Sequence, residues 1–596
     1  MAAPVPTAVE RVGLEAIDRL GREWGRLTSP TPLFKVKSVG LLPTGSGRHD
    51  KGKNPANRSP LAHKGNPRMP LRASLASIVI ACCVAAGGAV APAGADHPNI
   101  VVILADDMGY GDVKCNYPDG KIPTPHLDRL ASQGMRFTDA HAPSSLCTPT
   151  RYAVLTGQYA WRTRLKAGVL WEYDKPLIEE RRLTLPAMLR QHGYRTAAVG
   201  KWHLGLNWPF ASAESAKKIA KNRDSATCAD IDWSKPISGG PTDRGFDYYF
   251  GVNVPNFSPY AFVKNDRLVG PAPTEQVPRI DGRLSQLPGP GQAGFNRKQV
   301  APTLAKKACE WIEVSAKTGK PFFLYLALTG PHSPIIPNDE FKGKSGIGDY
   351  GDWVMEMDWT VGEVVAALTR AGVAENTLLI FTSDNGPEIW NYEEARDYKH
   401  YAMGPLRGVK QDTWEGGHRV PFIARWPGHV PADTTNAEVI CHSDLMATTA
   451  AIVGATLPVN AGEDSYNILP ALRGEKLAKP LREATVHHSG NGSLAIRQGN
   501  WVFIDAKSGG ARKEPEWFKR ERGYSDAPNK FPGVLYDLSQ DLAERRNLYG
   551  EHPDVVERLK ALLDKYRRDG RSTPGPTQQN DVAVSILADG TDRLSE

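Results

Sequence analysis

The segment Cys147-Thr148-Pro149-Thr150-Arg151 places a thiol, a proline and a guanidinium ahead of a helical stretch. Pro149 suits the first position of a helix that continues through Tyr152-Ala153-Val154-Leu155. The Cys147 thiol is therefore expected at a helix N-terminus, where unpaired N–H groups and the helix dipole favour negative charge. Arg151 adds a cation one turn further on. This spacing predicts a place for a sulfate or phosphate; the alternative is a buried cysteine beside a helix-starting proline.

Other polar side chains directly follow apolar runs that are typical of buried parallel strands. The runs cover residues 99–104, 195–200, 321–328 and 377–381. They are followed in turn by Asp106 and Asp107, by Lys201 and His203, by His332, and by Asp384 and Asn385. In open α/β sheets, ligands bind outside the carboxyl ends of the strands. We therefore expect all these side chains at one edge of a sheet.

The oxygen-bearing members of this set have the chemistry of a metal site. Asp106, Asp107, Asp384 and Asn385 offer hard oxygen ligands, which suit Ca²⁺ or Mg²⁺ better than a metal that prefers thiolate. Two adjacent carboxylates repel each other when no cation is present. Capping of turns is the alternative for each pair taken alone. Two pairs at two strand ends favour a metal site.

These segments together resemble the motifs of the sulfatase family, of the formylglycine-dependent arylsulfatase type within the alkaline phosphatase superfamily. Cys147-x-Pro149-x-Arg151 resembles the first signature of that family, and Gly200-Lys201-Trp202-His203-Leu204-Gly205 resembles the second. Further matches are Ala105-Asp106-Asp107, Gly330-Pro331-His332, Ser383-Asp384-Asn385-Gly386, Leu406-Arg407-Gly408-Val409-Lys410 and Thr413-Trp414-Glu415-Gly416-Gly417. The resemblance runs in the family's order from Pro98 to about residue 470.

The resemblance implies a mechanism in which a formylglycine-generating (sulfatase-maturing) enzyme oxidises Cys147 to formylglycine. The hydrate of that aldehyde would attack the sulfur of a sulfated small molecule or carbohydrate. The implied metal ligands are Asp106, Asp107, residue 147, Asp384 and Asn385, with Ca²⁺ as the usual cation and Mg²⁺ as the alternative. The implied catalytic residues are Cys147, Arg151, Lys201, His203, His332 and Lys410.

Their implied roles differ. Lys201, Lys410 and Arg151 would offset the charge of the sulfate. His332, with Lys410, would assist departure of the alcohol, and His203 would take the proton whose loss releases sulfate.

The order of elements predicts an α/β fold with a large mixed, mainly parallel sheet flanked by helices. The expected helices are 126–132, 185–192, 300–316, 353–371 and 444–453. Short apolar runs at 493–497, 501–504 and 534–538, followed by a helix at 553–567, predict a smaller C-terminal α+β subdomain with an antiparallel sheet. The expected domains are a catalytic domain at 96–470, this subdomain at 471–571 and a flexible tail at 572–596.

The first 95 residues differ from the rest. They contain 13 Lys and Arg against 5 Asp and Glu, which accounts for the formal charge of +7, so no nucleic-acid partner is expected. Basic residues near Met69, an apolar run and Ala93-Gly94-Ala95 predict a signal peptide at 69–95 and export to the periplasm or outside the cell. Residues 1–68 read as a disordered extension or a misassigned start. A transmembrane anchor, which needs ~20 clearly apolar residues, and lipid attachment at Cys82 are the alternatives.

Two other functions fit the same residues. Phosphonate or phosphate-ester hydrolases of the same superfamily share the metal site. A non-catalytic protein that binds sulfated glycans is the second alternative, if Cys147 stays unconverted.

Overall fold

The first apolar run forms the central strand, β1 (Asn99–Asp106), and all eight of its residues are buried. The computed structural model describes residues 97–525 and 527–584, so the predicted extension at 1–68 and signal peptide at 69–95 lie outside the described residues. β1 pairs in parallel with β10 (Phe322–Pro331) and with β11 (Thr377–Ser383). β10 pairs in parallel with β4 (Arg195–Lys201). The predicted parallel centre of the sheet is confirmed.

The large sheet has ten strands, with antiparallel pairs toward both edges. Their spatial order is β13 (Thr434–Asn436), β2 (Met135–Phe137), β12 (Phe422–Arg425), β11, β1, β10, β4, β5 (Tyr248–Val252), β6 (Val263–Lys264) and β7 (Arg267–Leu268). β12 runs antiparallel to β11 and to β2, while β5 runs parallel to β4 and antiparallel to β6. The sheet is therefore mixed and mainly parallel at its centre, as predicted.

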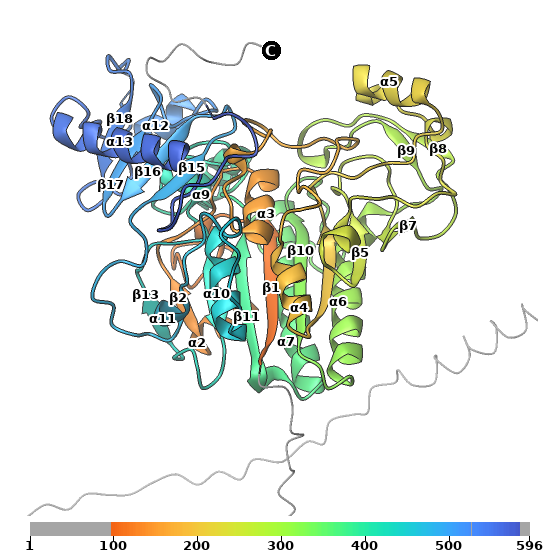
Figure 1. Cartoon of the computed structure of the whole chain (residues 1–596). Helices are drawn as coiled ribbons and strands as arrows, with labels where there is room; N and C mark the ends of the chain where they lie inside the picture. Colours follow the sequence, from red (N-terminus) through yellow and green to blue (C-terminus); the bar gives the residue numbers. More distant parts are fainter. Residues whose placement is uncertain (1–96, 526, 585–596) are drawn as a thin grey trace, which may run out of the picture. The chain divides into compact units, whose positions relative to one another are not determined.

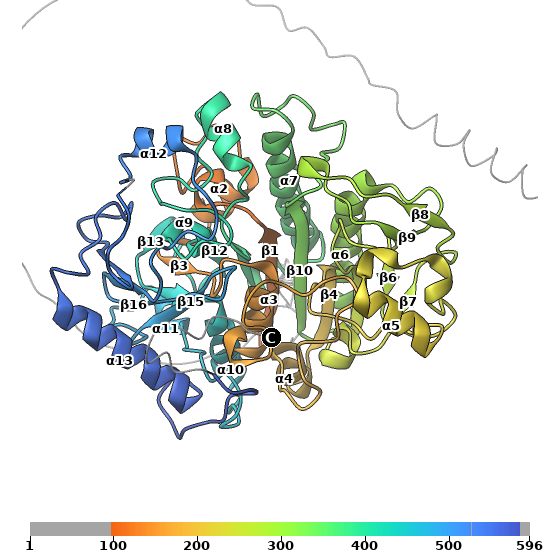
Figure 2. The same cartoon turned by 90° about the horizontal axis from the view of Figure 1, so that it is seen from above.

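Helices cover both faces of this sheet (Figures 1 and 2). Alternate side chains of a strand point to opposite faces, so Ile100, Val102 and Leu104 join one core while Val101 and Ile103 join the other. The first face carries α3 (Cys147–Thr156), α4 (Leu185–Gln191) and α10 (Leu445–Val453). The second carries α2 (Pro125–Ser132), α6 (Val300–Ala316) and α7 (Asp349–Arg370). Burial on both faces explains why the central strands read as continuous apolar runs.

The C-terminal part contains a separate antiparallel sheet, as expected. Its strands are β15 (Thr485–His488), β16 (Leu494–Gln498), β17 (Trp501–Ile504) and β18 (Val534–Asp537). The helix α13 (Pro553–Asp569) packs against it, with Leu559 and Leu563 in one core with Val486 and Phe503. β15 is an additional strand: its two histidines concealed it from a search for apolar runs.

The remaining named helices and strands are short. They are β3 (Ala140–His141), β14 (Ile440–Cys441), β8 (Glu275–Val277), β9 (Gly289–Gly291), α5 (Ala213–Lys221), α8 (Asn391–Tyr398), α9 (Glu415–His418), α11 (Leu469–Leu472) and α12 (Glu516–Arg522).

The described part of the segment expected to be a flexible tail is held by polar contacts. The N–H of Ser572 donates to Asp464 Oδ1 at 3.0 Å. Asn580 Oδ1 accepts from Arg162 at 3.0 Å, and Asp581 Oδ1 accepts from Arg182 at 2.8 Å. Residues 572–584 are therefore docked, while 585–596 lie outside the described residues.

Candidate functional site

The four central strands deliver their polar residues to one edge of the sheet. Asp106 is the last residue of β1 and Lys201 the last residue of β4. His332 directly follows β10, and Asp384 directly follows β11. Because these strands are neighbours and parallel, their carboxyl ends meet, as the sequence predicts.

Cys147 opens helix α3, so the helix starts two residues earlier than the proline predicts. Leu146 takes the N-cap position with an extended backbone, and Pro149 becomes the third helical residue, where its missing N–H still costs no intrahelical bond. The thiol is buried and lies 3.9 Å from Asp107 Oδ1. The predicted placement at a helix N-terminus, beside the carboxylates, is what the structure shows.

Lys201 donates hydrogen bonds to both carboxylate oxygens of Asp106. Its Nζ lies 2.8 Å from Oδ1 and 2.8 Å from Oδ2, and both side chains are fully buried. Burial alone would raise the pKa of Asp106, but the charges of Lys201 and Arg151 hold that pKa well below its usual range. Asp106 is therefore an ionised carboxylate.

Asp107 lies at the centre of the site. Its Oδ2 accepts from Lys410 Nζ at 2.7 Å, and its Oδ1 accepts from Asn385 Nδ2 at 2.7 Å. Its backbone N–H donates to Asp384 Oδ1 at 3.1 Å. Burial raises the pKa of Asp107 and the charge of Lys410 lowers it, while Asp106 raises it further. The pKa of Asp107 is therefore raised overall, which means that its negative charge is not fully compensated and that a further positive charge would be stabilised here.

The two histidines approach the site differently. His332 Nε2 lies 3.8 Å from Asp107 Oδ2, and its Nδ1 lies 2.5 Å from the carbonyl of Ser333. His203 Nε2 lies 2.8 Å from the carbonyl of Leu170, while its Nδ1 is buried with no hydrogen-bond partner among the described residues. Burial lowers the pKa of both imidazoles, and nearby lysines lower it further. Both rings are therefore neutral, and each keeps one nitrogen free as an acceptor.

Backbone strain accompanies this arrangement. Asp107 has a φ of 67° and His203 a φ of 56°, in the left-handed region that residues other than glycine rarely adopt. Such conformations cluster at functional sites, where the surrounding structure maintains them.

The sequence reasoning missed Glu388. Its Oε1 accepts from Lys410 Nζ at 2.9 Å, so Lys410 lies between Glu388 and Asp107. Burial opposes the ionised form, but the charge of Lys410 holds the pKa of Glu388 at about 2. Its position in the loop that follows Asp384, two residues beyond Gly386, was the available signal.

The donor set also fits a hard cation. Potential ligand atoms of Asp106, Asp107, Cys147 and His332 all lie within 4.8 Å of one another. Asn385 Oδ1 is buried and has no hydrogen-bond partner among the described residues. Carboxylates together with an unpartnered amide oxygen are the ligands that Ca²⁺ and Mg²⁺ prefer.

Comparison with known proteins decides the family. The family model described as "Sulfatase" matches residues 98–455. The chain belongs to the sulfatase family. It is accordingly a sulfuric ester hydrolase. The family that its sequence motifs suggested is confirmed.

Curated relatives of this sulfatase cover most of the chain. The N-acetylgalactosamine-6-O-sulfatase of Bacteroides thetaiotaomicron is 34% identical over 508 residues, covering 79% of this chain and 93% of the relative. Human arylsulfatase A is 33% identical, covering 83% and 92%. A solved Bacteroides thetaiotaomicron structure described as a 6S-sulf protein, from work on the metabolism of multiple glycosaminoglycans, is 32% identical with a TM-score of 0.67, covering 79% and 99%.

In residues 97–525 and 527–584 of this sulfatase, no helix has both the length and the apolar character needed to cross a membrane.

Proposed function

We propose that this sulfatase is an exported enzyme that hydrolyses carbohydrate sulfate esters, with residue 147 as formylglycine and with a hard divalent cation, Ca²⁺ in the first place. The observation that carries the proposal is the burial of Cys147 against Asp107, inside one cluster with Asp106 and His332. A structural cysteine gains nothing from such a surrounding. A cation held by these carboxylates would place positive charge beside residue 147, where an anionic sulfate group could bind.

The state of the Cys147 thiol supports its conversion. Burial raises the pKa of Cys147 well above its usual value, although Lys201 and Lys410 oppose the shift. An unmodified cysteine would therefore be a neutral thiol, which is a poor nucleophile. As formylglycine, residue 147 would supply an aldehyde hydrate, with one hydroxyl to attack sulfur and a second whose deprotonation releases sulfate.

The cation would be held by Asp106, Asp107, Asp384 and Asn385, with residue 147 beside them. When bound, it would supply positive charge next to a sulfate oxygen. The unpartnered oxygen of Asn385 and the raised pKa of Asp107 are the features of this chain that support such a ligand.

Proton handling falls to the other side chains. Lys410 has its pKa raised well above the usual value: burial works against the charge, but Asp107 and the other acidic neighbours outweigh it. It therefore keeps a proton to share with the departing alcohol, and His332 Nε2 is available beside it. His203 Nδ1, neutral and without a partner, is available to accept the proton whose loss releases sulfate.

The substrate class rests on the relatives. The match to the relative named N-acetylgalactosamine-6-O-sulfatase covers 93% of that relative. The match to the solved 6S-sulf protein covers 99% of that protein. We therefore propose a sugar 6-O-sulfate as the first substrate to assay.

Mass spectrometry of the peptide that spans Cys147, from the mature protein, tests the modification. We expect a mass lower than that of the cysteine peptide by the difference between a thiol and an aldehyde side chain. The N-terminus of the same protein tests export: it should begin after Ala95. Unmodified cysteine in protein from its native host would contradict the mechanism.

Activity is tested with a panel of sugar sulfates, an aryl sulfate and the matching phosphate esters. Cys147→Ser should lose at least ~10³-fold in turnover, because a serine ester has no second hydroxyl to release sulfate. Cys309→Ser, at a buried cysteine of α6, is the matched control and should retain activity. Faster hydrolysis of phosphates than of sulfates would overturn the substrate assignment.

A further inference from the structure

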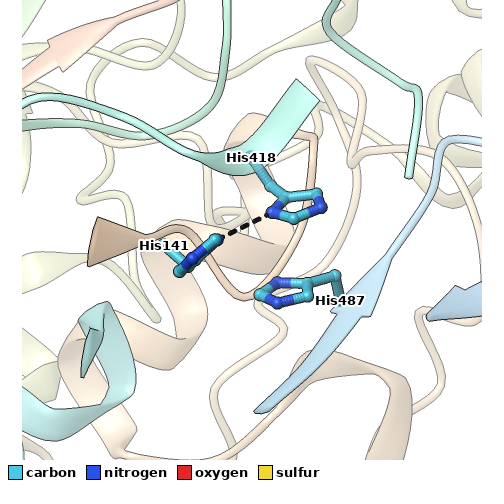
Figure 3. Close-up of side chains that lie close together, drawn as sticks. All are labelled: His141, His418 and His487. Atoms are coloured by element: carbon cyan, nitrogen blue, oxygen red, sulfur yellow. Dashed lines mark hydrogen bonds between the residues drawn. The ribbon is translucent and has the colours of Figure 1, made fainter. Parts of the chain in front are cut away.

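Three buried histidines meet at a second place in the protein (Figure 3). His141 ends β3, His418 ends α9, and His487 lies in β15 of the C-terminal sheet. Each is at most 1% exposed. None of them belongs to the strand ends that form the active site, so the sulfatase reaction leaves this cluster unexplained.

One nitrogen of each ring is held by an acceptor outside the cluster. His141 Nε2 lies 2.7 Å from Asp139 Oδ1. His418 Nε2 lies 3.1 Å from the carbonyl of Thr413, and His487 Nδ1 lies 3.1 Å from the carbonyl of Ala142. Carboxylates and carbonyls only accept hydrogen bonds, so these three nitrogens carry the protons.

The other nitrogen of each neutral ring is then a lone pair directed into the cluster. His141 Nδ1 and His418 Nδ1 lie 3.1 Å apart, as the dashed line in Figure 3 marks. His487 Nε2 is buried and has no hydrogen-bond partner in the described part of the chain. Two facing lone pairs and a third that is unpartnered are unfavourable unless something positive lies among them.

A different tautomer of His141 does not remove the problem. Arg497 Nη1 lies 3.1 Å from His141 Nε2. However, its two hydrogens are already directed to Asp139 Oδ1 at 2.7 Å and to Glu415 Oε2 at 3.2 Å. Even if Arg497 donated to His141, the lone pair of His487 would stay unpartnered.

A proton is a poor occupant. It would join His141 to His418 but would not reach the third ring. Burial lowers the pKa of all three imidazoles, to about 3 for His418, and this outweighs the charge of Glu415, which acts in the opposite direction on His141 and His418. The neutral form that burial favours is the form that binds metals.

We propose that His141, His418 and His487 form a trihistidine site for one divalent transition-metal ion of the Zn²⁺ class, separate from the active-site cation. Imidazole is a preferred ligand of Zn²⁺ at ~2.0–2.1 Å, which places two ligands of a tetrahedral ion about 3.3 Å apart. The 3.1 Å between the two Nδ1 atoms matches that spacing. The hydrogen bonds on the outer nitrogens are the supporting contacts that metal-bound histidines make.

The third ligand requires a local movement. The rings of His418 and His487 are stacked, with centroids 3.8 Å apart and planes at 6°. Lone pairs of parallel rings do not converge, so binding requires the His487 ring to tilt out of the stack. Loss of that stack is the structural change that accompanies the ion.

Glu415 lies close to one of the three histidines, His141. Its Oε2 accepts from Arg419 at 3.0 Å and from Arg497, whereas its Oε1 is buried and unpartnered. Glu415 lies with Asp139 and His141 in a group whose potential ligand atoms are all within 4.8 Å of one another. A fourth, oxygen ligand from Glu415 would give a closed site, as expected for a structural metal.

Such an ion would join three parts of the fold. It would tie β15 of the C-terminal sheet to β3 and to the short helix α9. The backbone of α9 also supports the active site, because the carbonyl of Gly417 accepts from the N–H of Gly386 at 2.8 Å. The proposed role is therefore structural, with an indirect effect on the loop that carries Asp384.

Zinc analysis of the full-length protein, stripped with a chelator and then supplied with Ca²⁺, tests the site. We expect it to bind one equivalent of Zn²⁺, and Co²⁺ in its place should give the intense visible absorption of a tetrahedral nitrogen site. His418→Gln and His487→Gln should each weaken Zn²⁺ binding at least as much as the ~10–100-fold that loss of an outer hydrogen-bond partner costs. His429→Gln, at an exposed histidine, is the matched control.

Asp107→Asn separates this site from the active site: zinc binding should survive that change. Anomalous diffraction at the zinc edge, on wild-type crystals, places the ion without any variant that must fold. An ion among the three histidines supports the proposal. Two results would overturn it: no zinc among the three histidines at saturating Zn²⁺, or zinc binding that Asp107→Asn abolishes while the histidine variants retain it.

Discussion

Arg151 contacts a single oxygen of Asp384 through two nitrogens, with Nε at 3.0 Å and Nη2 at 2.6 Å from Oδ2. The same guanidinium lies 3.4 Å from Asp106 and donates to the carbonyl of Lys201 at 3.3 Å. All of these side chains are buried. Arg151 therefore connects helix α3 to three strand ends and acts on the carboxylates, although the motif alone placed it against the sulfate.

Replacing Arg151 should cost stability as well as activity. Arg151→Met leaves Asp384 buried beside Asp106 with one cation fewer, and breaking a buried pair in this way costs ~3–5 kcal/mol of unfolding free energy. Arg151→Lys should lose less, since it keeps the charge but not the two-nitrogen contact. Urea unfolding at neutral pH measures both. Arg396→Met, in an exposed pair with Asp397, should change stability by no more than ~0.5 kcal/mol. An equally small change for Arg151→Met would contradict the assigned role.

Gly386 permits a close approach that no larger residue allows. A Cβ at this position would lie 1.9 Å from the carbonyl oxygen of Gly416. Gly386→Ala should push the segment of Asp384 and Asn385 away from α9, costing ~1–3 kcal/mol and lowering turnover of an aryl sulfate. Gly240→Ala is the control, because its Cβ would meet only a methyl of Leu206 at 3.0 Å. Retained activity and stability in Gly386→Ala would show that this contact does not position the site.

Asp412 should make the stability of the protein depend on pH. It is buried and accepts N–H bonds from Val409, Ala511 and Arg512 at 3.0, 2.8 and 3.2 Å. Burial nevertheless raises its pKa from 3.8 to about 7. Between these values the folded chain binds a proton that the unfolded chain has lost, so stability falls as pH rises from about 4 to about 7.

Unfolding of wild type and of Asp412→Asn across that range measures this contribution. The wild type should lose stability relative to the variant as pH rises, by about 4 kcal/mol at most. Asn keeps one acceptor oxygen for three N–H donors, so it should be the less stable protein at the acid end. Curves that run parallel from pH 4 to pH 7 would show that Asp412 does not titrate in this window.

The pattern of apolar residues along the sequence predicted most elements of the fold. The central strands are buried on both faces, so their apolar runs and the polar residues at their ends could be read directly, and the helices α2, α4, α6, α7 and α10 lie where expected. β15 was missed because its two histidines interrupt the apolar pattern, and the rings of α9 and β3 that pack against His487 are far away in sequence. Docking of residues 572–584 was missed for the same reason: their partners, Arg162 and Arg182, lie about 400 residues away.

The sequence by itself determined which groups stand at the carboxyl edge of the sheet, because the end of each apolar run can be read locally and parallel strands bring their carboxyl ends to one edge. Only the tertiary structure decided which charge neutralises which. It paired Lys201 with Asp106, Arg151 with Asp384, and Lys410 with both Asp107 and Glu388. It also brought together His141, His418 and His487 from segments up to 346 residues apart. In a buried site the low dielectric makes the interaction between paired charges strong. Which charges pair depends on their distances in space, and these distances cannot be read from the order of residues.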